Sequence, residues 1–212
     1  MKEDLIIDMN MDTKRAIAQL KALQRAGKSL RLAAEWNKPW QSLISTILSA
    51  RTTDVKTIEV SNKLYNKYNN IEKLACGKYA DVARIVKPVN FYKTKTKNII
   101  ACAKMIVYSY NGIVPRDFEK LVELPGVGRK TANVFLAHQG GAHIGVDTHV
   151  SYISQKMGWT KHTKPHLIEE DLEKLFPKKY WRDINYILVR FGQSYKSRKE
   201  KNAILDKIKK IK

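Results

Sequence analysis

The feature that most constrains the fold is a short glycine-rich turn between two stretches with helical spacing. Its residues are, in order, Leu124, Pro125, Gly126, Val127, Gly128, Arg129 and Lys130. Proline lacks an amide hydrogen and glycine tolerates a positive φ, so Pro125 and Gly126 should end the first helix. The periodic run 131–137 then continues a second helix. The sequence therefore predicts a helix, a tight turn and a second helix over about residues 117–137.

The short side chains of this turn should leave its backbone amides bare. Amides that converge at a helix N-terminus form an anion site, and glycine allows a bulky phosphodiester to come close. The turn therefore favours a nucleic-acid backbone as its ligand. A Schellman-type helix end is the other explanation for Gly126 and Gly128.

Two residues near the turn can carry chemistry. Lys130 falls in the first turn of the second helix, where the helix dipole and the neighbouring Arg129 disfavour an ammonium and favour a nucleophilic amine. Asp147, within the segment 146–150, supplies a carboxylate nearby in sequence. Taken singly, a surface lysine and a helix N-cap explain these two residues. The order of turn, lysine and later aspartate is more specific and favours a site.

Composition narrows the partner and the compartment. Forty basic and twenty acidic residues give a formal net charge of +20, which indicates a polyanionic partner, either nucleic acid or an anionic membrane. The two cysteines, Cys76 and Cys102, can form neither a disulfide framework nor a four-thiolate metal site. Acidic residues interrupt residues 1–8, and no apolar run has membrane-spanning length. We therefore expect a cytoplasmic protein with no membrane partner.

Helical spacing recurs along the chain, and no stretch gives convincing strand alternation, so the predicted fold class is all-α. The predicted helices cover residues 12–27, 39–48, 55–68, 71–76, 78–86, 99–110, about 117–124, 131–137, 148–157, 165–175 and 179–191. Gly158 and Gly192 are expected to end two of these helices. Residues 89–97 alternate like a strand but have no partner strand, and we interpret them as a basic turn that leads into a long helix.

The C-terminal segment 196–212 is basic and amphipathic. It holds eight basic residues among seventeen, and its apolar stripe consists of Ile204, Leu205, Ile208 and Ile211. Such a helix can lie on a membrane. We expect instead that the stripe packs on the body of the protein and that the charges face solvent or phosphate.

By these residues the chain resembles the endonuclease III family of DNA glycosylases, within the helix-hairpin-helix superfamily. Residues 124–133 match that family's hairpin almost letter for letter, and residues 146–150 match its catalytic-aspartate segment. Residues 39–54 and 91–95 resemble two further conserved blocks. The similarity spans roughly residues 30–195, so it covers the fold and not one motif.

The resemblance implies an all-helical molecule with two lobes and a DNA-binding cleft. A six-helix barrel lobe would cover about residues 32–142 and contain the hairpin. Residues 1–31 and 143–212, with the basic tail, would form the second lobe. The implied partner is double-stranded DNA that contains damaged bases or abasic sites, bound by a monomer.

The resemblance also implies a mechanism. The hairpin would grip the DNA backbone while the damaged nucleotide is flipped out of the stack. Lys130 would attack the exposed sugar carbon, and Asp147 would stabilise the developing positive charge. A Schiff base and β-elimination would follow, which makes a bifunctional glycosylase and abasic-site lyase for oxidised pyrimidines. The implied DNA-binding residues are Leu124, Pro125, Gly126, Val127, Gly128, Arg129 and His149, together with Arg51 and Phe91.

The chain departs from the family pattern at two places. Family members usually hold an iron-sulfur cluster on four C-terminal cysteines, whereas the stretch from Lys196 to Lys199 and all that follows it contain no cysteine. We therefore expect no cluster. Arg51 stands where the family commonly has a glutamine that fills the gap left by the flipped nucleotide; an arginine can fill this gap by stacking and hydrogen bonding.

Other interpretations stay open. Phe91 falls where the family places a wedge into the opposite strand, but a core aromatic at a helix start fits as well. No carboxylate cluster accompanies the histidines, so we expect no protein-ligated metal, while the resemblance allows a monovalent cation on the hairpin carbonyls. The rival functions are a mismatch or other altered-base glycosylase of the same fold and a non-enzymatic helix-hairpin-helix DNA-binding protein.

Overall fold

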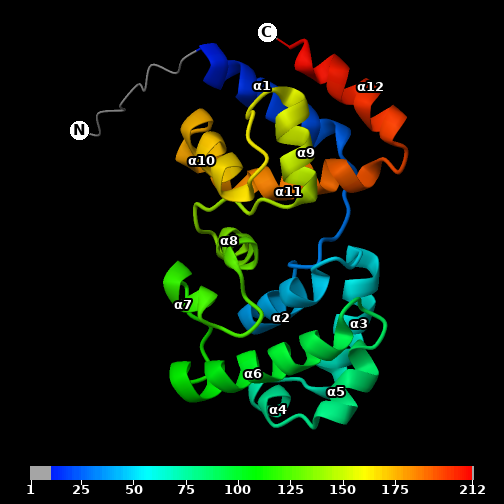
Figure 1. Cartoon of the computed structure of the whole chain (residues 1–212), viewed down its shortest axis with the longest axis vertical. Coiled ribbons are helices and arrows are strands. Elements are labelled where there is room, and N and C mark those ends of the chain that lie inside the picture. Colours follow the sequence, from blue (N-terminus) through cyan, green and yellow to red (C-terminus); the bar gives the residue numbers. More distant parts are fainter. Residues whose placement is uncertain (1–10, 212) are drawn as a thin grey trace, which may run out of the picture. The chain divides into compact units, whose positions relative to one another are not determined.

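All regular elements in residues 11–211, the part that the computed structural model describes, are helices (Figure 1). They are α1 (Met11–Ala26), α2 (Pro39–Ser49), α3 (Asp54–Lys67), α4 (Ile71–Ala75), α5 (Tyr79–Val86), α6 (Tyr92–Tyr110), α7 (Phe118–Val122), α8 (Arg129–His138), α9 (Thr148–Met157), α10 (Pro165–Leu175), the 3-10 helix η1 (Lys178–Tyr180), α11 (Trp181–Ser194) and α12 (Arg198–Lys209). The predicted all-α class is confirmed. Among these described helices, none combines the length and the apolar character that a membrane crossing requires.

The chain divides into two compact units. One, here called the central unit, is Arg31–Gly145 and contains α2 to α8. The other, the terminal unit, combines Met1–Leu30 with Val146–Lys212 and contains α1 and α9 to α12. The N-terminal helix therefore packs with helices from the far end of the chain, and each unit is described separately below.

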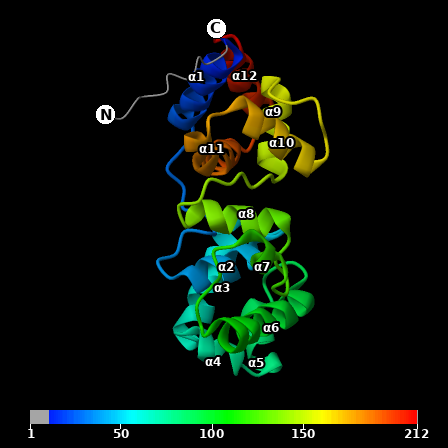
Figure 2. The same cartoon turned by 90° about the vertical axis from the view of Figure 1, so that its left-hand side faces the viewer.

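Helix α2 forms the centre of the central unit. Pro39 at its first turn is pre-organised for a helix, one side of α2 is apolar, and the opposite side carries the buried polar residues Ser42, Ser45 and Thr46. Eight of its eleven residues are buried, because α3, α6 and α8 all pack against it. Helices α4 and α5 lie against α6, as both views show (Figures 1 and 2). Because neighbouring helices pack on α2 from all sides, the positions of its two ends are fixed.

The terminal unit is built around α11. Helices α1 and α9 pack on it, and α10 contacts both α1 and α9. Leu20 and Leu23 of α1, Ile153 of α9, and Leu188 and Phe191 of α11 are essentially inaccessible to solvent. These residues give the unit an apolar core of its own.

The basic tail packs on this core, as predicted. Helix α12 contacts α1 and α9, and Leu205 and Ile208 of its apolar stripe are buried, while Ile204 and Ile211 are half-buried. On one side of α12, the Tyr152 hydroxyl donates a hydrogen bond to Asn202. The apolar stripe is therefore covered by protein.

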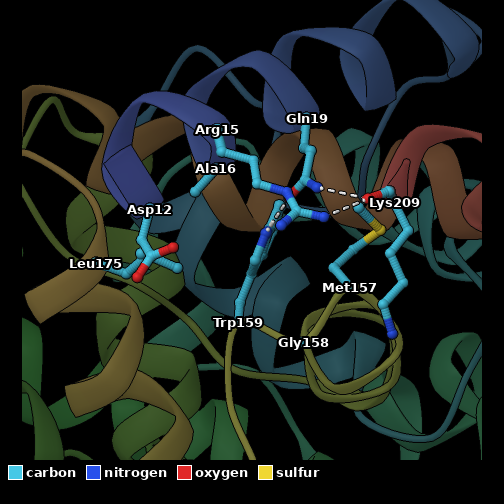
Figure 3. A pocket seen from close by; sticks show the side chains of 9 residues that line it. All are labelled: Asp12, Arg15, Ala16, Gln19, Met157, Gly158, Trp159, Leu175 and Lys209. Carbon is cyan, nitrogen blue, oxygen red and sulfur yellow. Dashed lines mark hydrogen bonds between the residues drawn. The ribbon is translucent and has the colours of Figure 1, made fainter. Parts of the chain in front are cut away.

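Helix α1 supplies partners for the C-terminal carbonyls of α12 (Figure 3). Arg15 Nη2 donates to the Lys209 carbonyl at 2.8 Å, and Gln19 Nε2 donates to the same carbonyl at 3.2 Å. Gln19 is buried and also accepts a hydrogen bond of 2.8 Å from the indole nitrogen of Trp159. An open pocket of about 430 Å³ adjoins these side chains. The junction ties α12 to α1 and to the loop that follows α9.

The predicted start of α6 and the predicted end of α11 were wrong. Helix α6 begins at Tyr92, so most of the predicted basic turn 89–97 is helical. Of its alternating lysines, Lys93 and Lys97 are exposed and Lys95 is buried. Gly192 does not end α11, which continues to Ser194. A side chain at Gly192 would collide with the ring of His149, since a Cβ there would lie 2.2 Å from Nδ1. Gly158, in contrast, caps α9 with a φ of 81°, as expected.

We expect Gln19→Leu to lower the free energy of unfolding by about 1–3 kcal/mol, because it leaves the buried indole N–H of Trp159 without an acceptor. Denaturant unfolding measures the difference. Gln24→Leu is the matched control, since Gln24 is exposed on the same helix. Equal losses in both variants would contradict the role assigned to Gln19.

Candidate active site and nucleic-acid interface

The predicted hairpin consists of α7, a turn and α8. The Asp117 carboxylate caps α7 by accepting from the Lys120 amide at 3.0 Å. Helix α7 ends at Val122, so the connection is longer than the predicted tight turn. The side chains of Leu124 and Val127 lie in the hydrophobic core, and the Val127 amide donates to the Leu124 carbonyl at 3.0 Å. These two predicted DNA-binding residues can therefore offer DNA their backbone only.

The two glycines of the turn have different reasons to be glycine. Gly126 has a φ of 83°, and a Cβ there would lie 2.9 Å from Asn98 Cβ. Gly128 is the N-cap of α8 with ordinary extended backbone, and a Cβ there would meet nothing within 4 Å. The fold therefore requires glycine at Gly126 but not at Gly128. At Gly128, the absence of a side chain keeps the start of α8 open to an outside anion.

Arg129 and Lys130 follow at the first two positions of α8. Arg129 is exposed, and its guanidinium carbon lies 5.4 Å from the centroid of the Phe118 ring. Lys130 is half-buried, and the three residues that follow it are buried. The Lys130 amine therefore projects from a helix that is fixed, directly after Lys130, by buried residues of the central unit.

The segment after α8 is held close to that helix. Asn133 is buried, and its side-chain amide donates to the Ile144 carbonyl at 3.2 Å. Gly145 lies so close to α8 that a Cβ there would be 2.3 Å from a methyl group of Val134. The central unit ends at this contact, and Asp147 follows two residues later in the terminal unit.

Asp147 is the N-cap of α9. Its Oδ1 accepts hydrogen bonds of 2.9 Å from the amides of His149 and Val150. The N-cap interpretation of Asp147 is confirmed, and both capping bonds use the same oxygen, so Oδ2 takes no part in the cap. The His149 ring is half-buried and lies against Gly192 of α11. Asp147 and His149 are therefore fixed by α9 and α11 within one unit.

Arg51 and Phe91 are brought together on the surface of the central unit. Arg51 follows the C-terminus of α2, and Phe91 is the residue directly before α6. Both have a left-handed backbone, with φ of 55° and 58°, which is uncommon for residues other than glycine. The Arg51 guanidinium carbon lies 5.1 Å from the centroid of the Phe91 ring, and 59% of Phe91 is exposed. Phe91 is therefore not a core aromatic.

Lys95 is a residue of this region that the sequence analysis missed. Its side chain is buried, and its ammonium donates to the carbonyls of Leu48 and Ala50 at 2.6 Å and to the Thr52 hydroxyl at 3.2 Å. Burial lowers the pKa of Lys95 to about 8. A signal was present: Lys95 precedes the buried Ile99 by four residues, which places both on one face of α6.

The residues do not fit the iron-sulfur cluster that the family resemblance implies. Cys76 is exposed and Cys102 is buried, both in the central unit, and burial raises the pKa of the Cys102 thiol to about 12. The stretch from Lys196 to Lys199 instead leads into α12. Across residues 11–211, no three histidine, cysteine or acidic side chains gather as a metal site would require. His162 Nδ1 lies 2.8 Å from Asp171 Oδ2 and makes an ordinary pair with it.

Residues 44–178 match the family model described as "HhH-GPD superfamily base excision DNA repair protein". The chain therefore belongs to this superfamily, and α7, the turn and α8 form its helix-hairpin-helix motif. Within the superfamily it belongs to the endonuclease III family, as its relatives show.

Three relatives illustrate this membership. The chain is 36% identical to endonuclease III of Synechocystis sp. over 192 residues, which are 90% of this chain and 88% of the relative. It is 41% identical to endonuclease III of Thermotoga maritima over 156 residues, 73% of each. The solved structure of a trapped endonuclease III–DNA covalent intermediate superimposes with a TM-score of 0.80 at 30% identity, covering 88% of this chain and 89% of the other. The predicted family is confirmed.

The two glycines of the hairpin give a test of the interface. Gly128→Ala should leave the melting temperature unchanged, because the added methyl meets open space, and should weaken DNA binding by its bulk at the start of α8. Gly126→Ala should instead destabilise the fold by about 1–2 kcal/mol or more, because alanine is strained at a positive φ. Thermal melts and fluorescence anisotropy with a labelled duplex measure both effects. Undiminished affinity in Gly128→Ala would place the DNA contact elsewhere.

Proposed function

We propose that this member of the endonuclease III family excises oxidised pyrimidines from duplex DNA and then cleaves the strand at the resulting abasic site. Membership of the family makes the chain a base-excision-repair DNA glycosylase and lyase. The main support for the proposal is the position of Lys130, which is the second residue of α8 and directly follows Arg129 at the open N-terminus of that helix. The substrate class and the roles of individual residues are the parts that we propose.

Lys130 is the proposed nucleophile. Its amine attacks the anomeric carbon of the flipped nucleotide, the glycosidic bond breaks, and the base leaves with its electron pair and takes up a proton. The C1′–O4′ bond then breaks, the nitrogen loses a proton and O4′ gains one, which opens the sugar ring and gives an imine. The imine lets the sugar lose a proton from its 2′ carbon, and the bond to the 3′ oxygen breaks so that the phosphate leaves. Hydrolysis of the imine returns the free amine. The trapped covalent complex formed by a relative is consistent with such an amine–sugar adduct.

Asp147 is the proposed electrostatic and proton-transfer partner. Its Oδ1 is committed to the cap of α9, which fixes the orientation of the carboxylate. The Oδ2 atom can then face the cationic sugar without losing the cap. A carboxylate held by two backbone amides needs no reorganisation when positive charge develops.

The remaining proposed contacts bind the DNA backbone and fill the position that the flipped nucleotide leaves. Within the hairpin backbone from Leu124 to Gly128, the amides of Gly126 and Gly128 would bind phosphates, together with the Arg129 side chain and with His149 at the start of α9. The amides of Leu124 and Val127 already donate within the hairpin. Arg51 would enter the gap left by the flipped nucleotide, and Phe91 would insert beside it.

A glycosylase for mismatched or otherwise altered bases is the second candidate. The observation that favours it is Arg51, because a guanidinium at the gap-filling position offers other hydrogen bonds to the unpaired base than a glutamine does. A panel of duplexes with single thymine glycol, dihydrouracil, uracil, mismatch or abasic sites separates the two candidates by the lesion that gives an adduct.

We also propose that the protein works without an iron-sulfur cluster and acts on DNA in the cytoplasm. The chemistry of the donor set supports the first point, since two cysteines cannot replace four thiolates. The absence of disulfide-forming cysteine pairs in the sequence supports the second. A monovalent cation on the hairpin carbonyls is a further proposal that rests on the family resemblance.

Substitutions of Lys130 and of Asp147 should impair different steps of the reaction. Lys130→Gln removes the amine, so no borohydride-trappable adduct should form on any lesion, while duplex affinity should persist. Asp147→Asn keeps a good N-cap and should therefore keep its fold, but base excision should slow by orders of magnitude. On a preformed abasic site, Asp147→Asn should keep more of its strand cleavage.

Two results would contradict these roles. An adduct in Lys130→Gln would mean that another amine is the nucleophile. Loss of DNA binding in both variants, with unchanged circular dichroism, would mean that the two residues serve backbone recognition.

Purified protein should contain no stoichiometric iron or acid-labile sulfide and should still cleave an abasic-site duplex. Metal analysis and absorption spectroscopy check the first part. Cleavage that survives treatment with an iron chelator checks the second, and one cluster per chain would overturn the proposal.

A further inference from the structure

Lys95 has no part in the chemistry proposed above, yet it is the most deeply buried charged residue of the central unit, with 6% of the residue exposed. Burying an ammonium is unfavourable unless all three of its N–H groups find acceptors. They do so here, on the carbonyls of Leu48 and Ala50 and on the hydroxyl of Thr52. All three acceptors belong to the end of α2 and the loop directly after it.

Asn90 joins the same loop from the other side. Its backbone amide donates to the Thr52 hydroxyl at 3.2 Å, and its side-chain amide donates to the Arg51 carbonyl. The Thr52 hydroxyl therefore accepts from both Lys95 and Asn90. These bonds join the loop that carries Arg51 to the loop that carries Phe91. We call the three residues Lys95, Thr52 and Asn90 the Lys95 clasp.

The backbone conformations of Arg51 and Phe91 indicate that the clasp holds these two residues in place. Arg51 and Phe91 both lie in the left-handed region, which an aromatic residue seldom adopts and which persists only where the surroundings enforce it. Each is directly next to a clasp residue. The result is an exposed arginine and an exposed phenylalanine held side by side, with the guanidinium over the ring.

We propose that Lys95 is a positioning residue that presents Arg51 and Phe91 as one preformed element for insertion into duplex DNA at a vacated base position. This inference rests on the proposed function, because it needs a nucleotide that leaves the stack. Preorganisation matters for such an element, since each side chain that must be ordered on binding reduces affinity. Lys95 itself is buried and touches no DNA.

The test compares an abasic site in a duplex with the same site in a single strand. Insertion between stacked bases is needed only in the duplex, whereas Lys130 can form its adduct in both. Lys95→Met keeps the length of the side chain and removes the donors. We expect the rate of borohydride trapping to fall about tenfold on the duplex and to change less than twofold on the single strand.

Lys97→Met is the matched control, because Lys97 is exposed on the same helix and carries the same charge. It should change both rates by the same factor. Thr52→Val is the second clasp variant: it removes one acceptor of Lys95 and the acceptor of the Asn90 amide, and it carries the test if Lys95→Met does not fold. Circular dichroism and thermal melting establish the folding of each variant.

A second readout reports the geometry directly. In a duplex with 2-aminopurine opposite a tetrahydrofuran abasic analogue, saturating wild-type protein should raise the fluorescence by unstacking the 2-aminopurine. Lys95→Met and Thr52→Val should raise it less at saturation, and Lys97→Met should match the wild type.

The outcomes separate the two proposals. If folded clasp variants lose the same factor on both substrates, or lose nothing on the duplex, Lys95 is only a structural cap of α2 and the inference is wrong. If the wild-type protein traps neither substrate, the proposed function has failed instead. A selective loss on the duplex together with a reduced fluorescence change supports the inference.

Discussion

The ends of helices are the constraint on which the candidate site depends. The first amides and last carbonyls of a helix have no partners within it, and a fold must supply them from elsewhere. In this chain the residues of interest all stand at such ends: Arg51 after α2, Phe91 before α6, Lys130 at the start of α8 and Asp147 at the start of α9. The partners of these backbone groups differ from end to end. A lysine donates to the carbonyls at the end of α2, an aspartate accepts from the first amides of α9, and α8 begins at a glycine that supplies no side chain.

Local signals in the sequence were enough to predict most of the helices. Asp117, where the predicted helix 117–124 begins, caps α7, and Thr53, two residues before the predicted helix 55–68, caps α3 by accepting from the Lys56 amide. Such caps involve neighbours in sequence, so the sequence contains the whole interaction. The hairpin was predicted on similar grounds, although α7 ends two residues before its predicted end and α8 begins two residues before its predicted start.

The errors concern interactions between distant segments. Lys95 was assigned to a basic turn because its partners, Leu48 and Ala50, lie more than forty residues away in the sequence. Gly192 was taken for a helix stop because nothing near it in sequence shows that the His149 ring approaches it. The motif alone also did not show that the side chains of Leu124 and Val127 complete the core. In each case tertiary packing decided what the local pattern left open.

Helix α12 shows which forces hold the C-terminal segment on the terminal unit, the segment in which the family resemblance implies four thiolates. The ion pair of Lys156 with Asp206, at 2.8 Å, is partly exposed and contributes at most about 1 kcal/mol. Burial of Leu205 and Ile208 contributes about 1.5–3 kcal/mol for each side chain. Apolar burial therefore sets the strength of the attachment, and the polar contacts select the register of α12. The stability of this attachment does not require the exposed lysines of α12, so their charge can serve an external polyanion without weakening the fold.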